Sequence, residues 1–216
     1  MTATSSLQPR RRRLRPEQRR ELIVAAAADE FGRRGFQEAR LSDIAEAAGT
    51  TKAVIYDHFA NKQALHEEVL AFTIREWAEA VGATIGEVDE PLDRLRAGFE
   101  AYFRFCDERP NARLLLFRDL TAGSDVAKAQ SRAQAFAADG AAAVFLSEPT
   151  FLAGHPQRER RAREVSHAVI GACNAIAGAP RLSVGQRTEL AMELLSPGLE
   201  EMRRVSRSSA SPSASS

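Results

Sequence analysis

Residues 42–62 read SDIAEAAGTTKAVIYDHFANK, and this stretch predicts two short helices joined by a tight turn. Ala45 leaves room for a second helix to cross close by. Gly49, four residues on, lets the chain bend between the helices at low steric cost. Ile55 then supplies an apolar contact back to the first helix. This small–glycine–aliphatic spacing is typical of a DNA-binding helix-turn-helix, whose second helix enters the major groove.

Charge is spread unevenly along the chain. The 216 residues carry a net charge of only +1, yet residues 1–65 hold 12 Lys and Arg against 8 Asp and Glu, and the remainder holds 18 against 21. A basic amino-terminal part joined to a mildly acidic body fits a DNA reader attached to another module.

Several classes of protein are not expected from this sequence. Cys106 and Cys173 lack metal-site or redox-motif spacing, so we expect reduced, buried thiols in a cytoplasmic protein, with a disulfide as the less favoured alternative. No apolar run approaches the roughly 18 residues that a membrane span needs. The polar, arginine-rich start lacks the apolar region of a secretory signal. No catalytic constellation, metal cluster or glycine-rich phosphate loop is recognisable, so neither an enzyme nor a cofactor is expected.

Helical periodicity extends along the whole chain and predicts an all-α fold of about nine helices. Gly35 is expected to close the first helix. The next two helices are predicted over residues 41–48 and 52–58. Asn61 and Ser183 are expected to cap later helices, and Pro197 with Gly198 is expected to end or kink the last one near Leu195.

The chain resembles the TetR family of transcriptional regulators over residues 19 to about 70. The residues that carry this resemblance are Arg20-Glu21-Leu22-Ile23, Ala26-Ala27, Phe31, Gly35-Phe36, Ile44-Ala45, Ala48-Gly49, Ile55-Tyr56-Asp57-His58-Phe59, Asn61-Lys62 and Leu65. The resemblance implies a three-helix DNA-binding head, a six-helix ligand-sensing and dimerising body, and repression that a small molecule relieves. We therefore divide the chain into a disordered basic arm (1–15), a helix-turn-helix domain (16–62), a ligand-binding and dimerisation domain (63–205) and a disordered Ser-rich tail (206–216).

Candidate DNA contacts lie at the second helix of the motif and around it. Lysine can donate to guanine acceptors, and Tyr and Thr hydroxyls can donate to phosphate oxygens. The candidates are Arg40, Thr50, Thr51, Lys52, Ala53, Tyr56, His58 and Lys62, with Arg12, Arg13 and Arg15 of the arm. The alternatives are a packing role for His58 and a merely solvated arginine run.

Three positions depart from the family pattern. Arg40 stands where the family usually has a Ser or Thr cap, although it can still reach phosphate, and Ser42 or Asp43 can partly compensate for the cap. Thr50 replaces an apolar residue after the turn glycine. Ala53 stands where glycine or another small residue is common, and it still permits close approach to bases. Because of these departures, the family pattern does not predict the operator sequence.

Two further sets of residues lie in the predicted body. Scattered aromatic residues among helices can enclose an apolar site, although ordinary core is the alternative for each. The candidate effector-pocket residues are Trp77, Phe99, Tyr102, Phe103, Cys106 and Phe117. A two-fold interface is self-complementary, and the last two helices offer apolar residues for one. The candidate dimer residues are Val169, Ala172, Ile176, Leu190, Leu194 and Leu195.

The leading functional hypothesis is a homodimeric repressor that binds a palindromic double-stranded operator and is released by an unidentified small-molecule effector. No membrane partner is expected. A ligand-independent regulator or an activator is the closest alternative, and an enzyme in the helical body is the alternative from another class. Salt-sensitive duplex binding without substrate turnover separates the regulators from the enzyme.

Overall fold

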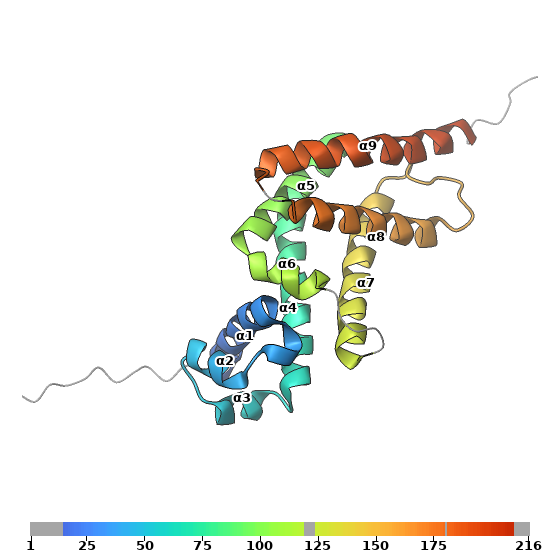
Figure 1. The fold of residues 1–216 in the computed structure, drawn as a ribbon. Coiled ribbons are helices and arrows are strands. Elements are labelled where there is room, and N and C mark those ends of the chain that lie inside the picture. The colour runs from blue at the N-terminus through green and yellow to red at the C-terminus, as the bar shows by residue number, and fades with distance from the viewer. Residues whose placement is uncertain (1–14, 119–123, 180, 210–216) are drawn as a thin grey trace, which may run out of the picture.

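The computed structural model describes residues 15–118, 124–179 and 181–209, and within these ranges its regular secondary structure is entirely helical (Figure 1). The helices are α1 (Pro16–Glu38), α2 (Leu41–Ala47), α3 (Lys52–His58), α4 (Lys62–Ile85), α5 (Pro91–Glu108), α6 (Pro110–Phe117), α7 (Asp125–Leu146), α8 (Arg158–Ala177) and α9 (Val184–Ser209). The expected all-α class with nine helices is confirmed over the described residues. None of these helices combines the length and apolar content needed to cross a bilayer.

Helices α1, α2 and α3 form a head around the first turns of α4, at the lower left of Figure 1. Its centre holds one or two fully buried side chains from each helix, namely Ile23 and Phe31 of α1, Ile44 of α2, Ile55 of α3 and Leu65 of α4. Burial of each such side chain contributes about 1.5–3 kcal/mol of transfer free energy. This shared core fixes the angle at which α3 is presented.

Local capping signals begin and end these short helices. Gly49 adopts φ +62°, a backbone conformation that glycine tolerates without strain. The Thr51 side chain accepts a hydrogen bond from the Val54 amide and begins α3 at the predicted residue. Asn61 caps α4 in the same way, with its Oδ1 2.8 Å from the Ala64 nitrogen. The predicted Asn61 cap and the predicted bounds of α3 are therefore confirmed.

The first helix changes direction at Gly35. Its φ of +80° and ψ of 167° are non-helical, and one short turn follows to Glu38. The expected end of the regular helix at Gly35 is confirmed. The following turn places Gln37 and Glu38 beside the start of α4.

Helix α4 runs from the head into the body, where α5 and α7 pack against it; α8 packs in turn on α7, and α9 packs on α5 and α8 (Figure 1). One body core surrounds Phe103, between α5, α8 and α9. A second core surrounds Phe151 of the loop before α8 and includes Ala142 of α7 and Leu199 of α9. Because α4 contributes to the head core and also borders the body, movement of this helix would affect both parts.

The last helix is longer than the sequence suggested. Ser183 Oγ accepts from the Gln186 amide as predicted, but α9 continues through Pro197 and Gly198 to Ser209. The expected end near Leu195 is wrong. Leu199 is buried, and Arg203 pairs with Glu148 at 2.6 Å, so tertiary contacts hold the segment beyond the proline. Helix α9 thus extends beyond residue 206, where the disordered tail was predicted to begin, and residues 210–216 lie outside the described residues.

Candidate nucleic-acid interface and internal cavity

Helix α3 presents a small and polar outer face. Ile55 is 1 % exposed and anchors the helix, whereas the next residue, Tyr56, is 55 % exposed. Thr51, Lys52 and Ala53 are also exposed at its amino-terminal end. Lys52 forms no ion pair with any described residue. The face therefore offers one free ammonium, two hydroxyls and a position small enough for close approach.

The start of α2 lacks a side-chain cap, as its sequence suggested. Arg40 occupies the cap position, and its side chain is exposed without a capping hydrogen bond. Asp43 lies in the first turn, where its charge complements the helix dipole. Thr50 is half-buried in the turn, and its amide donates to the Ala45 carbonyl at 2.8 Å.

His58 and Lys62 lie at the corner between α3 and α4 and are less accessible. His58 is half-buried beside the Phe59 ring. The Lys62 ammonium donates to the Gln37 carbonyl at 3.1 Å and lies 4.8 Å from the centre of the Phe36 ring. Partial burial lowers the pKa of Lys62. Its observed contacts join α4 to the end of α1, so any phosphate contact by Lys62 would compete with them or add to them.

The arginine arm is only partly within the described chain. Arg12 and Arg13 lie outside the described residues, and Arg15 is exposed at the start of α1. The Arg15 amide donates to the Gln18 side chain at 3.2 Å, which fixes the point where the arm leaves the head.

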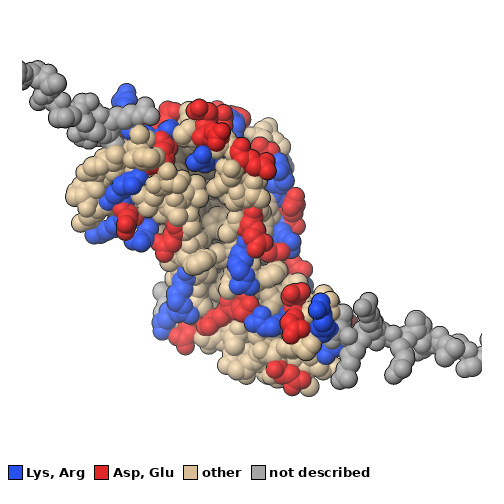
Figure 2. Space-filling view, turned by 180° about the vertical axis from the view of Figure 1, so that it is seen from behind, with Lys and Arg blue, Asp and Glu red and all other residues tan. Residues whose placement is uncertain are grey.

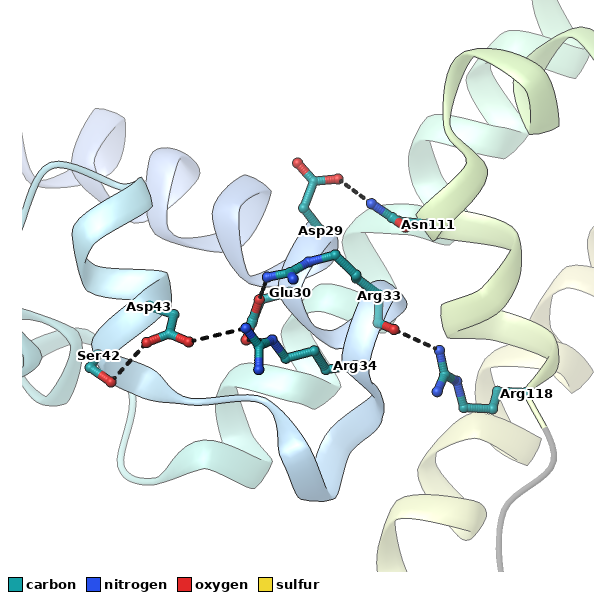
Figure 3. Close-up of polar contacts among 8 residues, drawn as sticks. All are labelled: Asp29, Glu30, Arg33, Arg34, Ser42, Asp43, Asn111 and Arg118. Carbon is teal, nitrogen blue, oxygen red and sulfur yellow. Dashed lines mark hydrogen bonds and ion pairs between the residues drawn. The ribbon is translucent and has the colours of Figure 1, made fainter.

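Ion pairs tie the helices of the head to one another (Figure 3). Glu30 is 5 % exposed and pairs with both Arg33 and Arg34 of α1. Arg34 also reaches Asp43 of α2 at 3.8 Å, and Asp43 in turn accepts from the Ser42 hydroxyl. The buried Glu30 carboxylate orders the two arginines of α1, whereas the Arg34–Asp43 contact between α1 and α2 is long and solvent-exposed and adds little stability by itself.

A second group of contacts joins the head to α6 (Figure 3). The Arg118 guanidinium donates to the backbone carbonyls of Gly32 at 2.6 Å and Arg33 at 3.2 Å. Asn111 Nδ2 donates to Asp29 at 3.3 Å. Arg118 therefore holds the carboxyl-terminal part of α1 from the end of α6.

A cavity of about 150 Å³ lies in the body between α4, α5, α7 and α8. Of the candidate pocket residues, Trp77, Phe99 and Tyr102 line it. Phe103 and Cys106 pack in the adjacent core instead, and Phe117 packs against the head core. These three residues lie outside the lining of this cavity, since Phe103 and Cys106 of α5 face the adjacent core and Phe117 belongs to α6.

Most residues that line the cavity were not in the candidate pocket set. Val144 and Phe145 of α7 and Cys173 of α8 line the cavity, and Val169, which was expected at a dimer seam, lines it too. The Cys173 thiol has its pKa raised to about 12 by burial, so it behaves as a neutral apolar group. The mixture of small and large apolar residues along α7 was the sequence feature from which this side of the cavity could have been predicted.

The remaining candidate dimer residues divide by exposure. Ile176 is buried, and Ala172, Leu190 and Leu195 are half-buried. Ile176, Leu190 and Leu195 pack into the body core. Leu194 is 63 % exposed. Ala168, Gly171 and Ala175 of α8 are exposed as well and were not in the predicted set.

The face shown in Figure 2 carries no patch of one charge sign. On the side shown in Figure 2, basic and acidic side chains are interspersed over the molecule. Affinity for a polyanion would therefore depend on the local groups of the head. A short helix that follows a tight glycine turn and presents exposed hydroxyls and an unpaired ammonium defines a helix-turn-helix DNA-binding protein.

Comparison with known proteins finds a family match in the amino-terminal part of the chain. Residues 23–69 match the family model described as "Bacterial regulatory proteins, tetR family". These residues form a DNA-binding region of the TetR type, and the chain is similar to transcriptional regulators of that family.

Relatives are similar over part of their length. The chain is 29% identical over 146 residues to the HTH-type transcriptional activator FasR of Mycolicibacterium smegmatis, covering 68% of this chain and 67% of FasR. It is 29% identical over 104 residues to the HTH-type transcriptional repressor KstR2 of the same organism, covering 48% and 50%. The chain thus spans half to two thirds of these relatives. A TetR-family structure from Rhodococcus sp. has the same fold, with a TM-score of 0.70 at 18% identity over 85% of this chain and 99% of that one.

Proposed function

We propose that this regulator is a homodimeric repressor that binds a palindromic operator in the cytoplasm and leaves it when a small molecule occupies the body cavity. One observation carries the proposal. The same chain has a free reading face on α3 and an apolar cavity against α4, the helix that runs between the head and the body. A single conformational change could therefore link the two sites.

The proposed roles of the head residues follow from their exposure. Thr51, Lys52, Ala53 and Tyr56 face outward on α3 and would contact bases and nearby phosphates. Arg40 would contact the backbone from the start of α2. His58, Lys62 and Thr50 are less exposed and would have secondary roles, and the arm residues Arg12, Arg13 and Arg15 would add phosphate or minor-groove contacts.

The proposed dimer uses the outer faces of α8 and α9. Leu194 and the small residues Ala168, Gly171 and Ala175 leave an accessible apolar surface on these helices. Small residues let two helices approach closely, and a two-fold axis would bring the same surface of a second copy onto it. Two heads could then read half-sites about 34–36 Å apart or somewhat more.

Release requires the ligand to prefer one of two states. A molecule in the cavity shifts the equilibrium only by its difference in affinity for the DNA-competent and DNA-incompetent arrangements. The cavity touches α4, and its α7 wall continues to residues that hold α6, which in turn holds α1. A ligand could therefore act on the head through α4 or through α7 and α6. Either set of contacts could give the two arrangements different affinities for the ligand.

The test begins with selection of genomic fragments bound by the full chain. Binding to a selected fragment is then measured at several salt concentrations for wild type, Lys52→Ala and Tyr56→Phe. Lys52→Ala should weaken binding by about 1–3 kcal/mol and relax the base preference at one position per half-site, if its contact is to a base. Lys128→Ala is the matched control, because it removes the same charge from the exposed surface of α7. If Lys52→Ala and Lys128→Ala bind the fragment with equal affinity and equal base preference, α3 is not the helix that contacts the bases.

Activation is the second candidate function, because FasR is an activator. In vitro transcription from the selected promoter separates the two. The proposed repressor lowers transcript yield when it is bound, whereas an activator raises it.

A further inference from the structure

Asp57 is an exposed acidic residue on α3, the helix that is proposed to contact the bases. This helix lies at the lower edge of the head in Figure 1, away from the body. The Asp57 carboxylate has no ion pair or hydrogen bond with any residue that the structure describes. It also lies in the last turn of α3, where the helix dipole disfavours a negative charge. The fold of the head therefore gives no reason for an acidic residue at this position.

Asp57 lies on the side of α3 that faces away from the core of the head. Ile55 is buried and marks the inward direction of the helix. Because successive residues turn by about 100°, Ala53 and Asp57 each lie within about 20° of the direction opposite Ile55. Both are exposed, as are Lys52 and Tyr56 at the side of this outward stripe. The carboxylate is therefore among the first groups that a DNA groove would meet.

The small size of Ala53 determines what Asp57 can reach. Aspartate has a short side chain, so its carboxylate contacts a base only if the backbone of α3 comes close to the groove floor. Ala53 precedes Asp57 by four residues and lies on the same stripe, about one turn away. Its single methyl group does not hold the helix away from the groove. The pair thus permits a close approach and presents an acceptor at the same time.

We propose that Asp57 selects cytosine at one position of each half-site by accepting a hydrogen bond from the exocyclic amine of that base. An ionised carboxylate has acceptors only. In the major groove, cytosine presents a donor, adenine presents a donor beside an acceptor, and guanine and thymine present acceptors without a donor. Cytosine therefore suits the carboxylate best. The inference rests on the proposed DNA-contacting role of α3 and names a further residue that determines its specificity.

The charge of Asp57 would also act against other sequences. A carboxylate near the DNA backbone is repelled by the phosphates, so it weakens binding to any duplex. A hydrogen bond from cytosine offsets this repulsion, whereas an acceptor on another base adds to it. Lys52 has the opposite preference, because its ammonium donates to guanine acceptors. The half-site that suits both side chains contains a guanine and a cytosine.

Affinities for every single-base variant of the selected DNA fragment test the proposal. Replacement of one cytosine per half-site should weaken binding of the wild type by about five- to 150-fold, as is typical for the loss of one base contact. Asp57→Ala should lose this preference and keep those at the other positions. Asp57→Asn should shift the preference toward adenine, because an asparagine amide can bond to both N6 and N7. A purely structural role of Asp57 would not produce that shift.

Glu46→Ala is the matched control. Glu46 is an exposed carboxylate on α2 of the same head, and it has no ion pair within the described ranges. Its loss removes the same charge and should leave every base preference unchanged, whatever its effect on overall affinity. Thermal unfolding checks the fold of the variants. Asp57→Ala should be at least as stable as the wild type, because α3 loses only an unpaired charge from its last turn.

Two results would overturn the proposal. One is an unchanged set of base preferences in Asp57→Ala, and the other is an equal gain in affinity for all fragments, which would mean that Asp57 only repels phosphates. If Lys52→Ala alters a base preference and Asp57→Ala does not, the inference fails and α3 remains the helix that contacts the bases. If the wild type binds no duplex, the proposed function fails and the inference fails with it.

Discussion

His66 is a buried titratable side chain in the head core. It is 3 % exposed, and its ring meets those of Phe31 and Phe36 at centroid distances of 4.9 and 5.2 Å. Its Nδ1 has no hydrogen-bond partner among the described residues. Burial lowers its pKa to about 4, so the imidazole is neutral in the folded protein at physiological pH.

The head should consequently lose stability in mild acid. An unfolded histidine has a pKa of about 6.5. Between this value and about pH 4 the unfolded chain binds more protons, so the free energy of unfolding falls as pH falls, by up to about 3 kcal/mol from this residue. Urea unfolding of wild type and His66→Phe at pH 7, 6, 5 and 4.5 measures the difference. A constant difference between the two proteins over this range would contradict the neutral, buried state of His66.

Single residues differ in how far the sequence predicts their roles. Thr51 and Asn61 were predictable because an N-cap needs only its own side chain and an amide three residues on. Tyr102 and Phe103 are adjacent aromatics, yet only Tyr102 lines the cavity. Periodicity places both in the interior, but it does not specify which neighbouring helix each will face.

At the scale of elements, α1 and α6 cross very closely at Gly32. A Cβ atom added there would lie 2.2 Å from the Asn111 carbonyl oxygen. Gly32→Ala should therefore force the two helices apart and destabilise the protein by about 1–3 kcal/mol. Gly82→Ala in α4 is the control, because a Cβ there meets nothing within 4 Å and alanine gains up to about 1 kcal/mol of helix propensity. Thermal unfolding of both variants measures the contrast, and equal stability would argue against this crossing.

Arg118 extends the same junction toward α7. It donates to the end of α1, while Gln130 of α7 donates to the Leu116 carbonyl at 2.6 Å and the Arg118 carbonyl at 3.1 Å. The opposite end of α7 carries Val144 and Phe145 of the cavity wall. A continuous set of contacts therefore runs from the cavity through α7 and α6 to the head.

Loss of the Arg118 side chain should loosen the head on the body. Arg118→Ala removes charge-assisted hydrogen bonds to Gly32 and Arg33, at a cost of about 1–3 kcal/mol. Amide hydrogen exchange over residues 29–38 should accelerate. Arg104→Ala, which removes an exposed pair with Glu100 on α5, should have little effect. Unchanged exchange in Arg118→Ala would mean that apolar packing alone docks the head.

Helix boundaries were predictable where local chemistry sets them and not where tertiary contacts do. Ser183 starts α9 through its own hydroxyl. The continuation past Pro197 depends on burial of Leu199 and on pairing of Arg203 with Glu148, partners that are distant in sequence. Pro197 removes one backbone hydrogen bond from α9. The contacts of Leu199 and Arg203 offset the free energy that this loss costs.

At the scale of the whole molecule, the TetR resemblance could be drawn from residues 19 to about 70 and the all-α class from helical periodicity along the chain, whereas the cavity and the dimer seam could not be predicted. The cavity joins four helices, and its α7 wall combines Ala141 with Val144 and Phe145, a mixture of small and large residues that matches no motif. The dimer interface depends on contacts with a second subunit. The hydrophobic pattern of one chain does not show which apolar residues make those contacts and which pack within the subunit. Exposure within one subunit narrows the choice, because a seam residue must be accessible before assembly.

Leu194 is the decisive position for the proposed dimer. It is 63 % exposed, so Leu194→Arg should leave the subunit folded. A two-fold axis would bring two arginines together, and sedimentation should then detect a monomer. Operator affinity should fall steeply, because one short helix contacts too few bases to bind tightly alone. Phe136→Arg on α7, where Phe136 is 66 % exposed, adds the same charge away from α8 and α9 and should remain dimeric. A folded Leu194→Arg dimer with native operator affinity would place the interface elsewhere.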